Sequence, residues 1–234
     1  MLDLFGLAIL DYQTNNNPEN IITETNISEP DEMVVDYLFR DFDQMPDLEQ
    51  KALSLSFGKI LDVGCGAGSH GLYLQNHKNL DVTAIDISAN AIKACELRGL
   101  KNTAVCNILD LQNQQFDTIL LLMNGTGIFE NLKKTSIYLQ KLKSLLSENG
   151  QILIDSSDLV YMYDDEDLDY FKQNPDEYYG ELTFDIIYKN QKEVPFYWLY
   201  LDFEKLKGLC LKNGLQCQMI LKGKNHDYLA KLFV

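Results

Sequence analysis

The chain has 234 residues, 46% of them hydrophobic, which is enough material for one large domain with a buried core. It contains 20 lysines and arginines against 35 aspartates and glutamates, so its formal net charge is −15. Proteins that bind DNA or RNA usually present a basic surface to the phosphates, so we expect no nucleic-acid partner.

The cysteines and the first residues bear on the cellular compartment. The five cysteines form no CxxC pair, and no histidine stands at metal-ligand spacing from them, so neither a metal site nor a disulfide framework is predicted. The apolar first ten residues lack the basic start of a signal peptide. No apolar run reaches the ~20 residues of a membrane helix. These features predict a cytoplasmic protein without a membrane partner.

Residues 1–57 are expected to form an N-terminal helical or lid segment. Residues 13–31 are rich in Asn, Thr, Glu and Pro, a composition typical of a loop or a mobile lid. After Pro30 the apolar residues recur at helical spacing, and a second helix is predicted after Pro46.

From Gly58 the chain alternates between strand and helix patterns. Strands are predicted at 59–63, 81–86, 103–106, 116–123 and 151–155, with helices at 67–77, 88–97 and 132–146 between them. Ser88 can cap the second of these helices and Gly99 can end it. Repeated strand–helix units of this kind predict a parallel sheet covered by helices on both faces.

The pattern changes after residue 155. Aromatic-rich strands at 181–188 and 194–200 predict an antiparallel hairpin inside an insert of about 156–200. A helix starting after Asp202 and two strands, at 216–221 and 228–234, close the chain. The predicted fold is therefore α/β, Rossmann-like and doubly wound. Its mostly parallel sheet carries an antiparallel C-terminal strand pair and the inserted hairpin within a domain at 58–234.

The motif LDVGCGAG, which ends at Gly68, lies where the first predicted strand meets its helix. Glycines there let the backbone approach a ligand closely. A dinucleotide fingerprint also matches, from Gly66 to Gly71, but that register would bury Asp62 within the strand. With Gly64 opening the turn, Asp62 lies at the mouth of the strand, where a carboxylate suits an ammonium group. The sequence thus favours a cationic, amino-acid-like ligand over a dinucleotide.

With this turn, the segment resembles motif I of class I S-adenosylmethionine-dependent methyltransferases. The resemblance covers roughly residues 58–155, and other stretches are similar to uncharacterised bacterial members of this size. It implies S-adenosyl-L-methionine as cofactor and the following cofactor-binding residues: Asp62, Gly64, Cys65, Gly66, Gly68, Asp86, Ile87, Asn107, Ile108, Met123 and Asn124.

The roles implied by the resemblance differ along the chain. Asp86 matches the acid that binds the ribose, and Ile87 can lie against the adenine. Asn107-Ile108 occupies the place of an Asp-Ala pair that contacts the adenine, and Asp110 is a competing candidate. The loop of Met123 and Asn124 is expected beside the sulfonium.

The implied reaction is in-line methyl transfer to a small or medium-sized acceptor. Two alternatives stay open: a protein that binds the cofactor without turnover, and an NAD-dependent oxidoreductase. No catalytic residue is singled out, and His70 is expected to be structural. The tyrosine-rich insert can wall a pocket, form a dimer face or be hairpin core. Pocket candidates are Tyr12, Tyr37, Asp155, Tyr178 and Tyr179, and possible bases also include Asp11 and Asp158.

Overall fold

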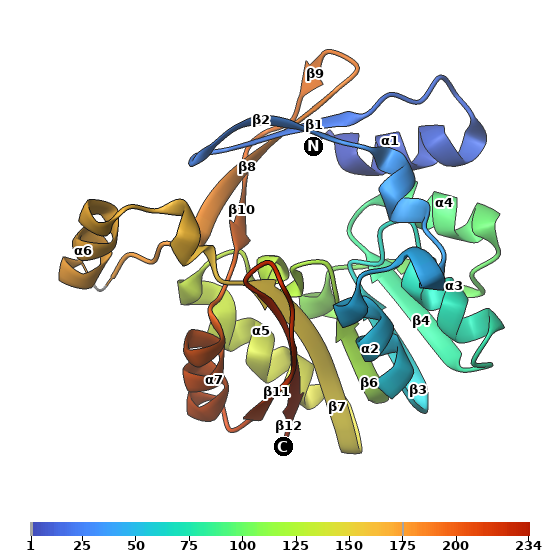
Figure 1. Ribbon diagram of the computed structural model, residues 1–234. Helices are drawn as coiled ribbons and strands as arrows, with labels where there is room; N and C mark the ends of the chain where they lie inside the picture. Colours follow the sequence, from blue (N-terminus) through green and yellow to red (C-terminus); the bar gives the residue numbers. More distant parts are fainter. Residues whose placement is uncertain (1, 175) are drawn as a thin grey trace.

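A seven-stranded sheet forms the centre of the computed structural model, which describes residues 2–174 and 176–234 (Figure 1). The strand order is β11-β12-β7-β6-β3-β4-β5. The strands are β3 (Lys59–Val63), β4 (Asp81–Asp86), β5 (Asn102–Val105), β6 (Phe116–Leu121), β7 (Leu146–Ser157), β11 (Gln216–Lys222) and β12 (Asp227–Phe233). Strands β3 to β7 pair in parallel, and β12 runs antiparallel to both β7 and β11. The predicted doubly wound sheet and its closing pair are confirmed.

Helices cover both faces of this sheet. On one face, α2 (Asp47–Leu55), α3 (Ser69–Asn76) and α4 (Ala89–Arg98) bury their apolar residues. On the other face lie α5 (Leu132–Ser144) and α7 (Phe203–Lys212). The Ser88 side chain accepts a hydrogen bond from the Ala91 amide, and Gly99 ends α4 with φ 93°, as the sequence predicts. Within residues 2–174 and 176–234, no helix has the length and apolar character needed to cross a membrane.

A second sheet, entirely antiparallel, has the order β10-β8-β1-β2, with β9 paired to β8. Its strands are β1 (Ile21–Thr25), β2 (Ser28–Met33), β8 (Glu181–Tyr188), β9 (Gln191–Lys192) and β10 (Phe196–Leu199). The predicted hairpin of the insert is present. However, β1 from the N-terminal segment pairs with β8 of the insert, so the two segments build one sheet (Figure 1).

This pairing corrects the prediction for residues 13–31. They form most of the β1–β2 hairpin instead of a loop, and the 3₁₀ turn η1 (Val35–Phe39) follows instead of a helix starting at Pro30. Strand β2 has the sequence SEPDEM and is almost wholly exposed, so it carries no apolar alternation. Its strand character comes from hydrogen bonding to β1, which the local sequence does not encode.

Helix α1 (Leu4–Thr14) connects the two sheets. Together with β1, η1 and β8 it buries a small apolar cluster of Leu4, Ala8, Ile21, Val35, Ile186 and Tyr188. Its capping residue Asp3 accepts a hydrogen bond of 2.7 Å from the Ser88 hydroxyl at the start of α4. The apolar start of the chain is thus a packed helix that holds the second sheet against α4.

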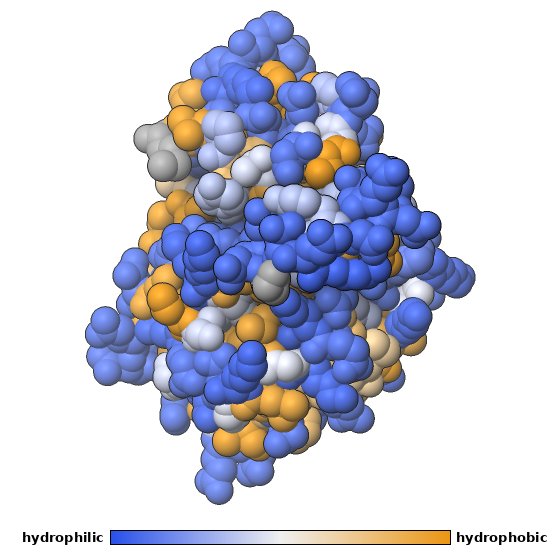
Figure 2. Space-filling model, turned by 90° about the vertical axis from the view of Figure 1, so that its left-hand side faces the viewer, coloured by the Kyte–Doolittle hydropathy of each residue, from blue (hydrophilic) through white to orange (hydrophobic). Residues whose placement is uncertain are grey.

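The remaining elements are short. They are α6 (Asp165–Gln173) and the 3₁₀ turns η2 (Phe42–Gln44), η3 (Ile108–Asp110), η4 (Gly125–Phe129) and η5 (Leu159–Met162). On the side of the molecule that carries α6, Figure 2 shows a largely hydrophilic surface with small, separate hydrophobic patches. Such a pattern is normal for a surface that faces water.

Candidate active site

The glycine loop after β3 lies at the carboxyl edge of the parallel sheet, where the strand order reverses between β4 and β6. Gly64, Gly66 and Gly68 have φ values of 69°, 52° and 80°, a region that side chains disfavour. A Cβ atom added at Gly66 would have a single neighbouring atom within 4 Å, in the Ile9 side chain at 4.0 Å. The space above this glycine is therefore open, in the crevice where open α/β sheets bind their ligands.

Asp86 ends β4 beside this loop. One carboxylate oxygen accepts a hydrogen bond from the Gly66 amide and the other from the Ser88 amide, both at 2.9 Å. Burial raises the pKa of Asp86. The next residue, Ile87, is 75% exposed. An acid and an uncovered apolar side chain therefore stand together at the end of the strand.

The loop after β5 holds the predicted adenine-binding pair. The Asn107 side chain accepts a hydrogen bond of 2.9 Å from the Leu109 amide and so caps η3. Asp110 is exposed, while Ile108 is buried in the core below the loop. Both polar candidates thus remain accessible at this edge of the sheet.

Asp62 lies at the carboxyl end of β3, separated from Gly64 only by Val63, as expected, but its side chain is buried. It is the second-last residue of β3, 2% exposed, because the pleat of the strand turns its side chain toward α3. A Cβ atom at Gly71 in α3 would approach its Oδ2 to 3.3 Å. Burial raises the pKa of Asp62. Its Oδ2 atom has no hydrogen-bond partner among the residues that the structure describes.

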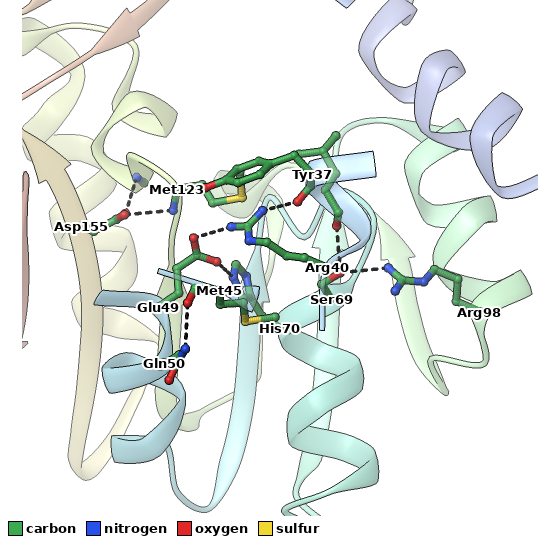
Figure 3. A network of polar contacts seen from close by, with 12 residues as sticks. Tyr37, Arg40, Met45, Glu49, Gln50, Ser69, His70, Arg98, Met123 and Asp155 are labelled. Carbon is green, nitrogen blue, oxygen red and sulfur yellow. Dashed lines mark hydrogen bonds and ion pairs between the residues drawn. The ribbon is translucent and has the colours of Figure 1, made fainter. Parts of the chain in front are cut away.

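Asp62 lies near enough to His70 for its charge to raise the pKa of that residue. His70 belongs to a buried ionic network (Figure 3). Glu49 of α2 contacts the Arg40 guanidinium with one oxygen and, at 2.5 Å, the His70 ring with the other. Burial disfavours the charged forms of Glu49 and His70. Their hydrogen bond and mutual attraction outweigh this effect, so the pKa of Glu49 is lowered and the pKa of His70 is raised. The Tyr37 ring covers the Arg40 guanidinium at 3.8 Å. Within the described part of the chain, the buried Nε atom of Arg40 has no partner.

The sequence interpretation missed this network. The network joins three separate segments, which carry Arg40, Glu49 and His70. A local sequence signal existed only for the segment of Glu49, which is the helix predicted after Pro46. His70 lies in α3 and is buried, in line with the structural role expected for it, although its partner was not foreseen.

The loop after β6 is held by Asp155 at the end of β7 (Figure 3). The Asp155 carboxylate accepts hydrogen bonds from the Met123 amide at 3.2 Å and the Gly125 amide at 3.0 Å. Met123 and Asn124 both have left-handed backbones, with φ 66° and 59°. Burial raises the pKa of Asp155 to about 6. Asp155 therefore positions the loop, although it was predicted as a pocket residue.

The predicted pocket tyrosines are placed differently from one another. Tyr178 is buried in the core, and its hydroxyl donates to Asp202 at 2.8 Å, so it does not wall a pocket. The Tyr179 hydroxyl donates to Asp158 at 2.9 Å. The Tyr12 hydroxyl donates to Asp36, and Tyr37 is 47% exposed above Arg40.

A group of aromatic side chains lies on β8, β10 and the residue after β10, and one of them reaches the carboxyl edge of the parallel sheet. Trp198 lies against η4: a Cβ atom at Gly127 would come within 1.8 Å of its ring. Phe196 packs edge-on against Trp198 at 6.2 Å, and Phe184 stacks on Phe196 at 6.1 Å and on Tyr200 at 6.4 Å. We call Phe184, Phe196, Trp198 and Tyr200 the aromatic surface.

The strand order, the reversal at β3 and the three left-handed glycines define a class I methyltransferase fold. The chain matches a family model described as a methyltransferase domain over residues 56–216 and belongs to that family. A solved structure of an S-adenosylmethionine-dependent methyltransferase from Bacteroides fragilis, in complex with S-adenosyl-L-homocysteine, is 42% identical. The match covers 99% of this chain and 94% of the other, with a TM-score of 0.89.

Two further similarities are more distant. A Papaver bracteatum protein named "Probable (S)-tetrahydroprotoberberine N-methyltransferase 2" is 29% identical over 42% of this chain, and the match spans 28% of that protein's length. A sugar N-methyltransferase from a Streptoalloteichus species is 13% identical over 88% of this chain and 94% of the other, with a TM-score of 0.57, and shares the fold. The chain is an S-adenosylmethionine-dependent methyltransferase, which confirms the predicted family, reaction and cofactor.

Proposed function

We propose that this methyltransferase acts on a small or medium-sized organic acceptor, enclosed between the carboxyl edge of the parallel sheet and the aromatic surface. The contact of Trp198 with Gly127 carries this proposal, since it sets the aromatic surface directly above the loop that follows β6. Aromatic rings with a few polar groups are typical walls of small-molecule sites. The Papaver relative, by its name, is a probable N-methyltransferase of (S)-tetrahydroprotoberberine.

The residues present fit S-adenosyl-L-methionine. The space above Gly66 is open, and the buried Oδ2 atom of Asp62 lacks a partner among the described residues, as does the Nε atom of Arg40. Asp62 would accept from the ammonium of the ligand, and Arg40 would donate to its carboxylate. At the adenosine end of the cofactor, Asp86 would bind the ribose and Ile87 would lie against the face of the adenine. Asn107 or Asp110 would contact the edge of the adenine.

The bound cofactor supplies an already activated methyl group, so the protein has to align and enclose the reactants. Asp155 holds the backbone of Met123 and Gly125 with its two oxygens, which fixes the loop between the cofactor and the acceptor. The second sheet covers that loop through Trp198 and excludes water from the methyl-transfer geometry.

We place the reaction in the cytoplasm. All five cysteines are free thiols in the structure, and three of them, Cys65, Cys95 and Cys210, are buried. The sulfur atoms of Cys65 and Cys95 lie 3.8 Å apart without a disulfide, which suits a reducing compartment.

Calorimetry and a turnover assay test the proposal. We expect binding of S-adenosyl-L-homocysteine and none of NAD. Gly66→Val should abolish this binding because its side chain would fill the open space above the loop. Gly99→Val is the matched control, since Gly99 is also left-handed with no atom near its Cβ position, at the end of α4. In the turnover assay, S-adenosyl-L-methionine and a low-molecular-mass cell fraction should together yield S-adenosyl-L-homocysteine. Turnover confined to the protein or nucleic-acid fraction would contradict the proposal.

A further inference from the structure

We propose that the methyl acceptor is an organic amine, whose nitrogen becomes cationic against the aromatic surface of Phe184, Phe196, Trp198 and Tyr200. This inference rests on the proposed function and specifies its acceptor. Faces of aromatic rings attract cations through their quadrupoles, most strongly for tryptophan. An amine is the common acceptor type that carries a positive charge after methylation.

The four rings form one continuous surface. Phe184 pairs with Phe196 across β8 and β10, and Leu182 pairs with Trp198, so these side chains share one face of the second sheet. The stacked and edge-on contacts at 6.1 to 6.4 Å link Trp198 to Tyr200 through the two phenylalanines. Phe196 is 36% exposed, so ring faces remain available to a ligand.

An acidic residue, Asp155, lies near this surface. Burial raises the pKa of Tyr200 to about 12. Its neighbours Tyr161 and Asp155 shift this pKa in the same direction. The Tyr200 hydroxyl therefore stays neutral. On the opposite face of the sheet, Lys192 is paired with Glu24 at 3.8 Å and Asp185 at 3.2 Å. The surface thus offers π faces that suit a cation and not an anion, and the buried carboxylate of Asp155 lies behind it with its oxygens on the Met123 and Gly125 amides.

The chemistry of the transfer agrees with this electrostatic arrangement. The lone pair of a neutral amine attacks the methyl carbon, the carbon–sulfur bond breaks, and its electrons return to sulfur. The positive charge moves from sulfur to nitrogen, and any hydrogen left on the product nitrogen is released to water as a proton. A cation is therefore present near the aromatic surface before and after the transfer. A phenol would instead have to lose its proton beside Asp155.

Trp198 provides a direct readout, since it is the single tryptophan of the chain. With the protein saturated by S-adenosyl-L-homocysteine, its fluorescence is titrated with benzyltrimethylammonium and with neopentylbenzene, the neutral molecule of the same shape. We expect the cation to bind at least fivefold more tightly. Phe196→Leu should remove most of this preference. Tyr197→Leu is the matched control, because Tyr197 is the next residue of β10 and points to the other face.

Equal affinities for the two probes, or no saturable change with either of them, would overturn the amine inference. So would a preference that Phe196→Leu and Tyr197→Leu reduce equally. The outcome is separable from the proposed function, because calorimetry with S-adenosyl-L-homocysteine is done first. A protein that binds this ligand but shows no preference for the cation remains a methyltransferase with a different acceptor.

Discussion

At the scale of single residues, two carboxylates at strand ends organise the loops around the site. Asp86 accepts from the amides of Gly66 and Ser88, and Asp155 accepts from those of Met123 and Gly125. Each fixes a backbone that has to adopt left-handed conformations. Both groups therefore shape the site through the loops that they hold.

For Asp86 we expect that substitution by alanine weakens binding of S-adenosyl-L-homocysteine by about 1.5 to 3 kcal/mol, the usual loss for a hydrogen bond to a charged group. Calorimetry measures this change, and circular dichroism checks that the variant is folded. Asp86→Asn is the control that keeps one acceptor for the Gly66 amide and should lose less. A folded alanine variant with unchanged affinity would exclude the ribose role.

For Asp155 we predict a pH effect on stability. Its folded pKa of about 6 lies above the ordinary value of 3.8, so the folded state binds the proton more tightly than the unfolded chain. The contribution of this group to stability is present at low pH and is lost as the pH rises from about 4 to 6. The loss is on the order of 3 kcal/mol.

Urea unfolding of the wild type and of Asp155→Asn across this range tests the prediction. The variant has no titrating group at this position. As the pH rises, the free energy of unfolding of the wild type should therefore fall relative to that of the variant. Parallel pH curves for the two proteins would show that Asp155 does not titrate as described.

At the scale of elements, strand β1 joins the two ends of the fold. It pairs with β2 on one side and with β8 on the other, and its first residue, Ile21, is completely buried in the cluster shared with α1. The second sheet is thus packed together with α1 around its own small core.

Ile21→Ala should destabilise this core by about 2 to 5 kcal/mol, the range for removing a large buried aliphatic side chain. Hydrogen exchange should show α1 and β8 losing protection together, because both pack on Ile21. Glu32→Ala, at an exposed position of β2, is the control and should change stability by less than about 0.5 kcal/mol. Loss of protection confined to β1 would mean that the cluster does not couple these elements.

The sequence was most informative where structure is determined locally. The glycine loop, the Ser88 cap and the order of strands and helices all depend on neighbouring residues and are as predicted, although β7 begins at Leu146 and not at residue 151. The pairing of Ile22 with Ile187 and the contact of Arg40 with Glu49 depend on distant segments meeting. Such partners leave no local pattern, which is why the second sheet and the ionic network were missed.

At the scale of the whole molecule, the net charge of −15 creates a field that repels polyanions and attracts cations. We therefore expect no binding of duplex DNA or RNA at 50 mM salt by fluorescence anisotropy. A basic protein of this size, measured in parallel, is the positive control. Tight binding that weakens steeply with added salt would contradict the prediction and reopen a nucleic-acid acceptor.

The pairing of β1 with β8 also has a consequence for how the protein is made. The N-terminal hairpin leaves the ribosome early, but its partner strand, residues 181–188, is synthesised only after most of the parallel sheet. Until then the edge of β1 that pairs with β8 is free and the cluster around Ile21 lacks Ile186 and Tyr188. An unpaired strand edge is prone to associate with other chains. Nascent chains that stall before residue 188 should therefore depend on chaperones more than complete ones do.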